Sequence, residues 1–224
     1  QKLRHTARVG HMSLVTLALY LDLRPKAVVR LLVLSYLEIG GACRMETSGR
    51  FDAGECFHGC VSGVASLSKL SVGGALGNWD ISGGASVRVD AKFDESIYVV
   101  SGVAQVTASE AGQRVQVETV GGASLRLDVS DASLVRIGAA GVPSVTVAGR
   151  TDSLTVECGG GGRVNAVALD ACQARVGCSG VASVELNVSG ELDVSVTGAS
   201  RVTYSGDARI VSQSVSRASS LRKR

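Results

Sequence analysis

A glycine returns along the chain every 18 to 20 residues, and an aliphatic residue stands four positions after each one. Eight copies run from Gly63 to Gly198, and a ninth has Arg217 in the glycine position and Leu221 in the aliphatic one. Such regular spacing over most of a 224-residue chain is the signature of a repeat architecture. We expect a structural turn at each repeat, made by Gly83, Gly102, Gly121, Gly141, Gly160, Gly180 and Gly198.

The residues before each glycine alternate between apolar and polar, which is the pattern of a strand with one buried face. A second short alternating run follows each glycine, as in Val145 and Val147. A repeat with two such strands cannot bury its apolar face alone, whereas stacked repeats bury it together. We therefore predict an all-β fold, a right-handed parallel β-helix of about eight or nine coils. Like residues should stack four positions before the glycines, including Val117, Ile137, Val156 and Val176.

The repeat divides the chain into an N-terminal segment, residues 1–60, and a β-helix domain, residues 61–224. We expect the segment to be irregular or partly helical, acting either as a cap or as a degenerate targeting region. Its apolar run Ala27–Cys43 loosely resembles a signal sequence, but Arg30 and Glu38 interrupt it. We favour an amphipathic helix or an edge strand packed on the main domain. Because the ends of a β-helix expose unpaired edges, residues 1–60 should cover one end and Arg217–Arg224 the other.

The charges are unevenly distributed, although the formal net charge is only +3. Residues 1–44 hold seven basic and two acidic side chains, and the last eight residues hold four basic ones. That leaves 12 basic and 18 acidic residues in the body of the chain, 45–216. A nucleic-acid-binding protein needs a basic surface on its folded part, so this distribution argues against nucleic acid as a partner.

The C-terminal half resembles a known family. The residues that carry the likeness are Ser179–Ser189, Glu191–Val194, Thr197–Asp207 and the final turn Ser216–Leu221, where Arg217 replaces a glycine. These recurring Ser-Gly-Ala-Ser-like turns resemble the head GIN-domain family, also called putative auto-transporter adhesin, over about residues 61–224. The resemblance implies an exported β-helical domain, often on a bacterial lipoprotein. It implies no established enzymatic activity and supplies no catalytic residues.

The sequence offers no catalytic set and no cofactor site. His5, His11 and His58 all lie outside the regular repeats, so no Ser-His-Asp or Cys-His set can be assembled. The outward carboxylates are separated pairs: Ser109 stands between Asp90 and Asp128, and Gly138 stands between Glu118 and Glu157. Two coils separate the members of each pair, roughly 10 Å by strand spacing. We interpret them as solvated surface charges.

The six cysteines have a structural interpretation. Cys158 and Cys178 occupy one inward column, where small buried hydrophobic groups are expected, although a disulfide between coils is an alternative. Cys172 is expected in a turn. A structural zinc site usually needs four ligands, and only Cys43 could join Cys56, His58 and Cys60, so we predict no metal. The disulfide status of all six cysteines stays open.

Three further motifs favour structural roles. Trp79 and Tyr98 share an inward column and predict a stacked core pair, with a sugar-stacking platform as the alternative. The run Gly159–Gly162 precedes Arg163 rather than Lys-Ser/Thr, so it is a turn and not a phosphate loop. Asn187-Val188-Ser189 is a glycosylation sequon, meaningful only in a eukaryotic secretory route.

The outward faces are rich in small polar residues, which suit weak multivalent contact with a repetitive partner. We therefore expect a non-enzymatic β-helix at the cell surface or in the periplasm, outer-membrane-anchored or extracellular, acting in adhesion or envelope interaction. Its partner would be a glycan or another surface protein, with no membrane-spanning segment and with self-association through the coil ends. The alternatives are a carbohydrate-active lyase or hydrolase and an intracellular scaffold. The small polar positions are Ser62, Ser82, Ser101, Ser179, Thr197 and Ser216.

Overall fold

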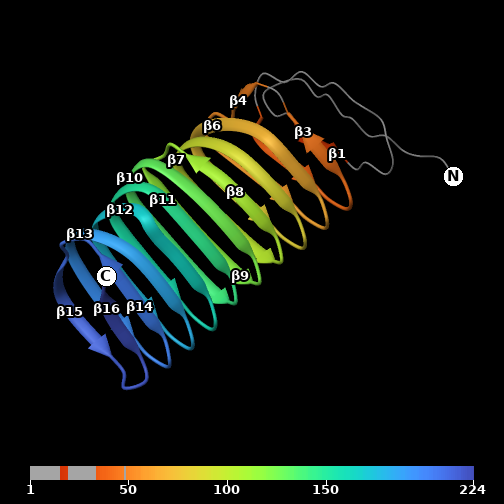
Figure 1. Ribbon diagram of the computed structural model, residues 1–224. Helices are drawn as coiled ribbons and strands as arrows, with labels where there is room; N and C mark the ends of the chain where they lie inside the picture. Colours follow the sequence, from red (N-terminus) through yellow and green to blue (C-terminus); the bar gives the residue numbers. More distant parts are fainter. Residues whose placement is uncertain (1–15, 20–33, 48) are drawn as a thin grey trace.

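The computed structural model describes residues 16–19, 34–47 and 49–224, in which every regular element is a β-strand. All described strand pairs are parallel, and the chain winds as one coil from β2 (Tyr36–Ile39) to β16 (Ser220–Lys223) (Figure 1). The strands are β1 (Thr16–Leu19), β2 (Tyr36–Ile39), β3 (Arg44–Glu46), β4 (Arg50–Asp52), β5 (Cys56–Val61), β6 (Ser66–Ile81), β7 (Ser86–Gly102), β8 (Gln105–Glu110), β9 (Arg114–Gly121), β10 (Ser124–Gly141), β11 (Ser144–Cys158), β12 (Arg163–Cys178), β13 (Ser183–Val196), β14 (Arg201–Ser205), β15 (Arg209–Val215) and β16 (Ser220–Lys223).

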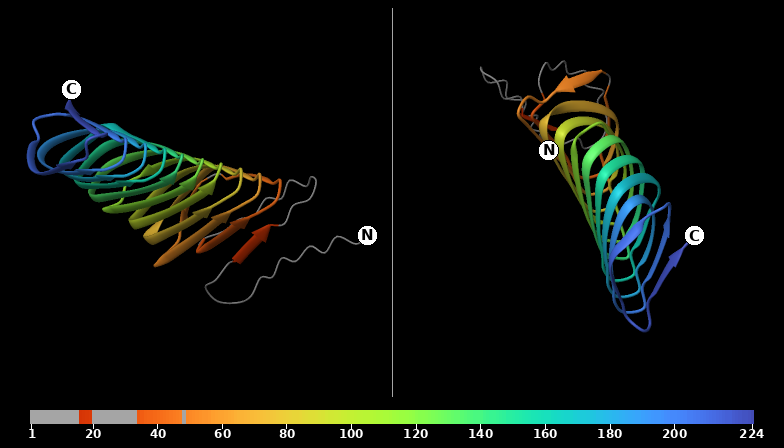
Figure 2. Two further views of the ribbon diagram at one scale, coloured as in Figure 1. Left: turned by 90° about the horizontal axis from the view of Figure 1, so that it is seen from below. Right: turned by 90° about the vertical axis from the view of Figure 1, so that its left-hand side faces the viewer.

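The predicted parallel winding is confirmed. Strands pair in the order β1-β2-β5-β6-β7-β8-β10-β11-β12-β13-β14-β16, while β3, β4, β9 and β15 pair beside this path. Two further views show the coils stacked one after another along the rod, in the order of the sequence (Figure 2). Long strands such as β10 bend from one wall of the coil to the other. They remain paired through the bend because their backbone hydrogen bonds run to the neighbouring coils and not across the coil. The result is a β-solenoid of about ten turns.

The central stacking prediction is confirmed. Ile137 pairs in register with Val117 on one side and with Val156 on the other, and Val156 pairs with Val176. All four side chains are at most 1% exposed. The alternation of the sequence therefore places these residues in one enclosed column, where burial of apolar surface stabilises the fold.

The solenoid starts before residue 61, which corrects the boundary expected from the repeat. Tyr36–Ile39 already pairs with His58–Val61, and Leu34, Leu37 and Ile39 are buried in the common core. This first coil turns at Gly41, whose amide oxygen accepts the N–H of Val64. Gly41 precedes Gly63 by 22 residues, so it falls outside the 18-to-20-residue spacing.

The expected helix is absent from the described part of the chain, and residues 36–39 form a strand instead. That strand pairs with β1 on one side and with β5 on the other, so the described part of the apolar run Ala27–Cys43 is an internal strand and not the edge strand that was the alternative to a helix. The parts of the expected cap in residues 1–15 and 20–33, with His5 and His11, lie outside the described residues. Within those that are described, no helix has the length and apolar character to cross a membrane.

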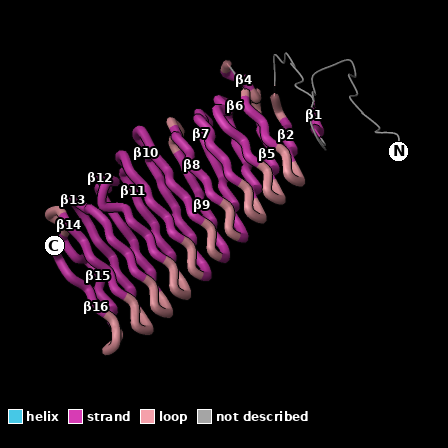
Figure 3. The backbone as a smooth tube through the Cα atoms, turned by 45° about the vertical axis from the view of Figure 1, so that its right-hand side comes forward, coloured by secondary structure: helices cyan, strands magenta, loops and turns pink. Residues whose placement is uncertain are grey.

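The corner turns lie in one row along a long edge of the rod (Figure 3). Gly180 illustrates why glycine stands there: its φ is +81°, and an added Cβ would lie 2.6 Å from the carbonyl oxygen of Gly160 on the preceding coil. A side chain at Gly180 would meet both an unfavourable backbone conformation and a fixed backbone atom. Gly121 has the same geometry, with φ +90° and an approach of 2.9 Å to the Gly102 oxygen.

Aromatic side chains fill the N-terminal half of the core. Trp79 and Tyr98 stack with ring centroids 5.9 Å apart and planes 1° apart, and Phe57 packs on Trp79 at 4.8 Å. Trp79 is 1% exposed and Tyr98 is fully buried. The predicted core pair is confirmed, and the sugar-stacking alternative is wrong because neither ring reaches solvent. Gly59 sits in the same column because an added Cβ would lie 2.7 Å from Trp79.

Candidate functional site

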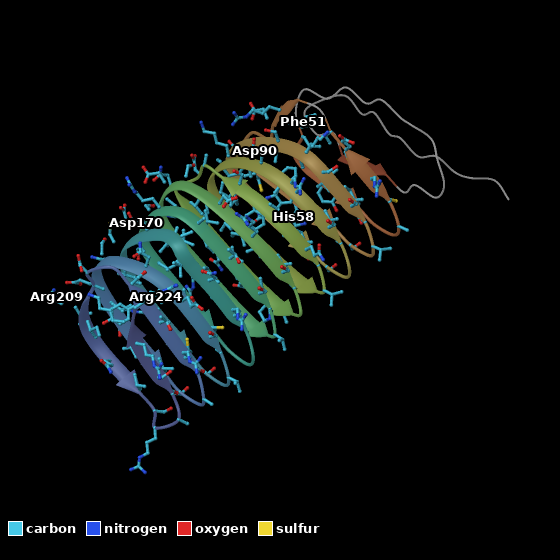
Figure 4. All side chains as sticks on the ribbon, viewed as in Figure 1. Phe51, His58, Asp90, Asp170, Arg209 and Arg224 are labelled. Atoms are coloured by element: carbon cyan, nitrogen blue, oxygen red, sulfur yellow. The ribbon has the colours of Figure 1, made fainter. Side chains whose placement is uncertain are left out.

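One wall of the solenoid carries three outward columns of side chains, which lie one, three and five residues before each corner glycine. We call this wall the outer face. It is built from β5, the C-terminal parts of β6, β7, β10, β11, β12 and β13, and all of β9 and β15. Alternation of the strand turns these side chains away from the buried columns. Side chains line this wall in rows along the rod, with His58 near its N-terminal end (Figure 4).

The outer face is hollowed between β9 and β13, where a groove of ≈ 560 Å³ opens to solvent. Two glycines form its floor. Gly138 pairs with Glu118 and with Glu157 on the neighbouring coils, and Gly177 pairs with Glu157 and Ser195. Each glycine therefore leaves a gap beside a carboxylate. From β9 to β13 this outward column consists of Glu118, Gly138, Glu157, Gly177 and Ser195.

Neither floor glycine is required by the backbone. Their φ values lie outside the left-handed region, and an added Cβ would come no closer than 3.7 Å to Glu118 at Gly138 and 3.9 Å to the Val156 oxygen at Gly177. Both distances are ordinary van der Waals contacts. The fold would therefore accommodate side chains at both positions, and the groove is not a requirement of the backbone.

Polar groups line the groove in fixed pairs. Arg136 Nη2 lies 3.2 Å from Glu157 Oε1, and Gln116 Nε2 donates to Glu118 Oε1 at 2.9 Å. The Arg136 and Glu157 side chains are 54% and 64% exposed. Exposed ion pairs contribute little to folding, typically less than about 1 kcal/mol. These groups keep free donors and acceptors that point to solvent, which a polar ligand could use.

The separated carboxylates lie as the sequence predicted. Ser109 pairs with Asp90 and with Asp128 on the opposite wall, and Gly138 separates Glu118 from Glu157. Adjacent strands are about 4.8 Å apart, so the members of each pair are about 10 Å apart. Among the described residues, no three side chains of His, Cys, Asp or Glu are grouped closely enough to hold a metal ion.

The Cys-x-His-x-Cys motif lies along β5 with its three side chains on the outward side. Cys56 and His58 are exposed and Cys60 is partly buried, whereas Cys43 is buried. The His58 ring stacks on Tyr36 with centroids 5.6 Å apart. The fourth ligand that a zinc site would need is therefore not presented on this surface by Cys43.

The inward cysteines behave as packed hydrophobic groups. Cys158 and Cys178 pair in register, both are buried, and both are free thiols, so the predicted stacking is confirmed and a disulfide between them is absent. Burial raises the pKa of Cys178 to about 12, with a further contribution from Cys158. Cys172 was expected in a turn, but it lies exposed within β12. Cys56, Cys60 and Cys172 are also free thiols.

One buried ionisable group was missed from the sequence. Glu110 is 2% exposed at the end of β8, where its neighbours in register are Ala91 and Val129. The Tyr98 hydroxyl donates a hydrogen bond to it. The sequence held a signal: the residues eight positions after the two neighbouring corner glycines are Ala91 and Val129, both apolar. It faces the core, away from the outer-face groove.

A comparison with protein families gives one match. The family model described as Putative auto-transporter adhesin, head GIN domain, matches residues 22–208. The match begins earlier than the resemblance seen from residue 61, in keeping with the extra first coil. Searches of curated proteins and of solved structures gave no match.

Proposed function

The chain belongs to the family of the putative auto-transporter adhesin, head GIN domain, and from this premise we propose that it is a non-enzymatic binding module of the cell surface or periplasm. Its role would be adhesion or interaction with the envelope. The observation that carries the proposal is the outer-face groove, floored by Gly138 and Gly177 and lined by exposed charged and amide groups.

The chemistry of the groove suits a polyhydroxylated ligand such as a glycan. Glu118 and Glu157 offer carboxylate oxygens that accept hydrogen bonds from hydroxyl groups, while Arg136 and Gln116 offer donors. The gaps at Gly138 and Gly177 would admit a ring or an acyl group beside Glu157. Because the solenoid continues the face in steps of about 4.8 Å, an extended polymer could contact several coils at once and gain affinity through multivalency.

Catalysis is the alternative, since Glu118 and Glu157 form a carboxylate pair across Gly138. A glycosidase needs one carboxylic acid that stays protonated, and enzymes achieve this by burying it. The Glu157 side chain is instead 64% exposed and ion-paired with Arg136. The geometry therefore supports binding better than acid catalysis.

We propose export on the strength of the family, with the first coil retained in the mature protein. Cleavage just before Cys43 would remove β2, whose Leu37 and Ile39 are buried in the core. Cell fractionation followed by N-terminal sequencing tests this proposal. A fraction outside the cytoplasm with Tyr36 still present supports it, and a cytoplasmic protein contradicts it.

A glycan array tests the proposed ligand class, with a double variant that fills the groove. Gly138→Val and Gly177→Val together add side chains where the fold has room, and β-branched residues are favoured in strands. We expect the variant to lose binding to the glycans that the wild type retains. The control is Ser109→Val, an outward position on the opposite wall, which should bind as the wild type does.

The same glycans should be incubated with the protein and analysed for depolymerisation. Retention of intact polymer agrees with a binding module, and shortened chains favour the enzyme alternative. Equal binding by wild type and groove-filled protein would contradict the outer-face groove as the site.

A further inference from the structure

The corner edge carries the four most exposed large hydrophobic side chains in the part of the chain that the structure describes. Val64, Val103, Val142 and Val181 are 67%, 68%, 71% and 69% exposed. Each directly follows a corner glycine, so all four occupy the same position of the repeat. In the repeats between them this position holds Gly84, Gly122 and Gly161. We call these seven positions the corner ridge.

The alternation of valine and glycine is not required by the fold. Gly84, Gly122 and Gly161 have φ values outside the left-handed region, as do the valines at the equivalent position. An added Cβ would lie 3.5 Å from Val64 at Gly84, 3.6 Å from Val103 at Gly122 and 3.8 Å from Val142 at Gly161. The fold could therefore accommodate either valine or glycine at this position in every coil. The strict alternation of the two is not explained by packing within the chain.

The ridge has a regular shape. Valines stand on every second coil, so neighbouring valine side chains are about 10 Å apart along the rod, with a gap at each glycine between them. The row of corner loops that carries them runs along one edge of the molecule (Figure 3). No charged residue occurs from one position before to two positions after the corner glycine in these seven coils. An apolar row without charge can approach another surface without desolvating an ion.

We propose that the corner ridge binds a second copy of this chain, with the valines of each copy seated in the glycine gaps of the other. The argument is one of matched period: a row of projections about 10 Å apart fits a row of gaps with the same spacing, and this chain carries both on one edge. The proposal is independent of the ligand proposed for the outer-face groove.

An antiparallel arrangement about a two-fold axis satisfies every position. Val103 then faces Gly122 of the partner subunit, and Val142 faces Gly84 of the partner subunit. The same register sets Val64 against Gly161 of the partner subunit and Val181 against the small Ala42 of the partner subunit. Such a contact is isologous and closes as a dimer, whereas a parallel pairing shifted by one coil is heterologous and leaves one coil at the end of each ridge without a counterpart.

The contact is narrow, so the dimer should be weak. A single edge of seven coils falls at the low end of interface sizes, which is typical of transient association. The full chain should therefore be studied by sedimentation equilibrium up to about 1 mM, a concentration that detects such weak dimers. We expect a monomer–dimer equilibrium, and small-angle scattering should show a thicker particle of nearly unchanged length.

Two variants test the fit between valines and gaps. Replacing Val64, Val103, Val142 and Val181 by serine should weaken the dimer at least about tenfold, because apolar burial is lost. Replacing Gly84, Gly122 and Gly161 by valine makes the edge more apolar but fills the gaps, and should also weaken the dimer at least about tenfold. Val211→Ser is the control: Val211 is 50% exposed on β15, away from the ridge, and its variant should dimerise normally.

Three results would overturn the proposal. The first is a wild-type protein that stays monomeric throughout the concentration range. The second is a gap-filled variant that associates as tightly as the wild type, because this indicates general adhesiveness of an apolar edge. The third is a dimer of doubled length, which indicates association through the coil ends. Thermal unfolding of each variant shows whether it is folded. If the gap-filled variant does not fold, the serine variant still tests the proposal.

Discussion

The Tyr98 hydroxyl donates a hydrogen bond to the Glu110 carboxyl group inside the solenoid. Both residues are buried, and the other carboxyl oxygen of Glu110 has no hydrogen-bond partner in the structure. Burial is the main cause that raises the pKa of Glu110 to about 7. A carboxyl group held this way favours its neutral form, because the charged form is poorly solvated in the core.

Glu110 should make the protein less stable as the pH rises. Its pKa is higher in the folded chain, about 7, than the ordinary 4.5, so the folded state holds the proton more tightly. The stabilisation is complete below pH 4.5 and is lost as the pH rises through about 7, with a total of about 3 kcal/mol. Urea unfolding at pH 5 and pH 8 should show this loss in the wild type and not in Glu110→Gln. Identical pH dependence of the two proteins would rule out this role for Glu110.

Gly180→Val should lower the free energy of unfolding by a few kcal/mol. The substitution places a β-branched residue at φ +81° and brings its Cβ within 2.6 Å of the Gly160 oxygen. Gly121→Val should act in the same direction. The matched control is Gly177→Val, since Gly177 has no positive φ and an added Cβ would make only an ordinary contact, 3.9 Å from the Val156 oxygen. Thermal melts in which Gly180→Val and Gly177→Val unfold within a degree of each other would contradict the corner geometry.

Ile137→Ala should destabilise the protein by about 2–5 kcal/mol, the usual cost of a cavity in a packed core. Its neighbour Arg136 points outward and is half-exposed, so Arg136→Ala should cost less than about 1 kcal/mol. Denaturant titrations of the two variants measure the difference. Similar losses at both positions would show that the wall does not alternate between core and solvent. Arg136→Ala should also reduce glycan binding, which a purely structural change at Ile137 should affect only through unfolding.

The cysteines should divide into two classes of reactivity. Cys56 and Cys172 are exposed and should be alkylated quickly in the native protein. Cys158 and Cys178 are buried, and burial raises the pKa of both thiols, so they should react only after unfolding. Mass mapping after a short treatment with iodoacetamide distinguishes the classes. Modified Cys178 in native protein would show that the core column is accessible to solvent.

Most of the fold could be predicted from the sequence because the same pattern of apolar residues occurs in every repeat. Val117, Ile137, Val156 and Val176 recur at the same phase, and a solenoid is the arrangement that buries all of them. The first coil was missed because Gly41 stands 22 residues before Gly63, which a search for the mean spacing passes over. Cys172 was misplaced since the strand β12 continues through the bend at this position, with a register shift against β13 between Ala171 and Gln173. The right-handed sense of the winding stays a prediction.

The candidate site was less accessible to sequence reasoning. Glu118, Gly138 and Glu157 were recognised as outward neighbours, but their significance as a groove depends on Gly177 and Arg136 meeting them on adjacent coils. A groove is made by missing side chains, and a glycine in a repeat is first interpreted as a turn. The ridge valines were overlooked for a related reason. An exposed apolar residue in a turn is not unusual by itself, and the pattern is visible only when the residue after each corner glycine is compared along all the repeats.

The most direct test of the account is a distance measurement between spin labels on one outward column. His58 and Asp193 are joined by seven steps of in-register pairs through Asn78, Ile97, Gln116, Arg136, Thr155 and Arg175. With Cys56 and Cys172 replaced by serine, labels at 58 and 193 should give a narrow distribution near about 34 Å, and labels at 116 and 193 one near about 19 Å. Broad distributions, or distances that do not scale with the number of coils, would contradict the winding on which the outer face, the groove and the ridge all depend.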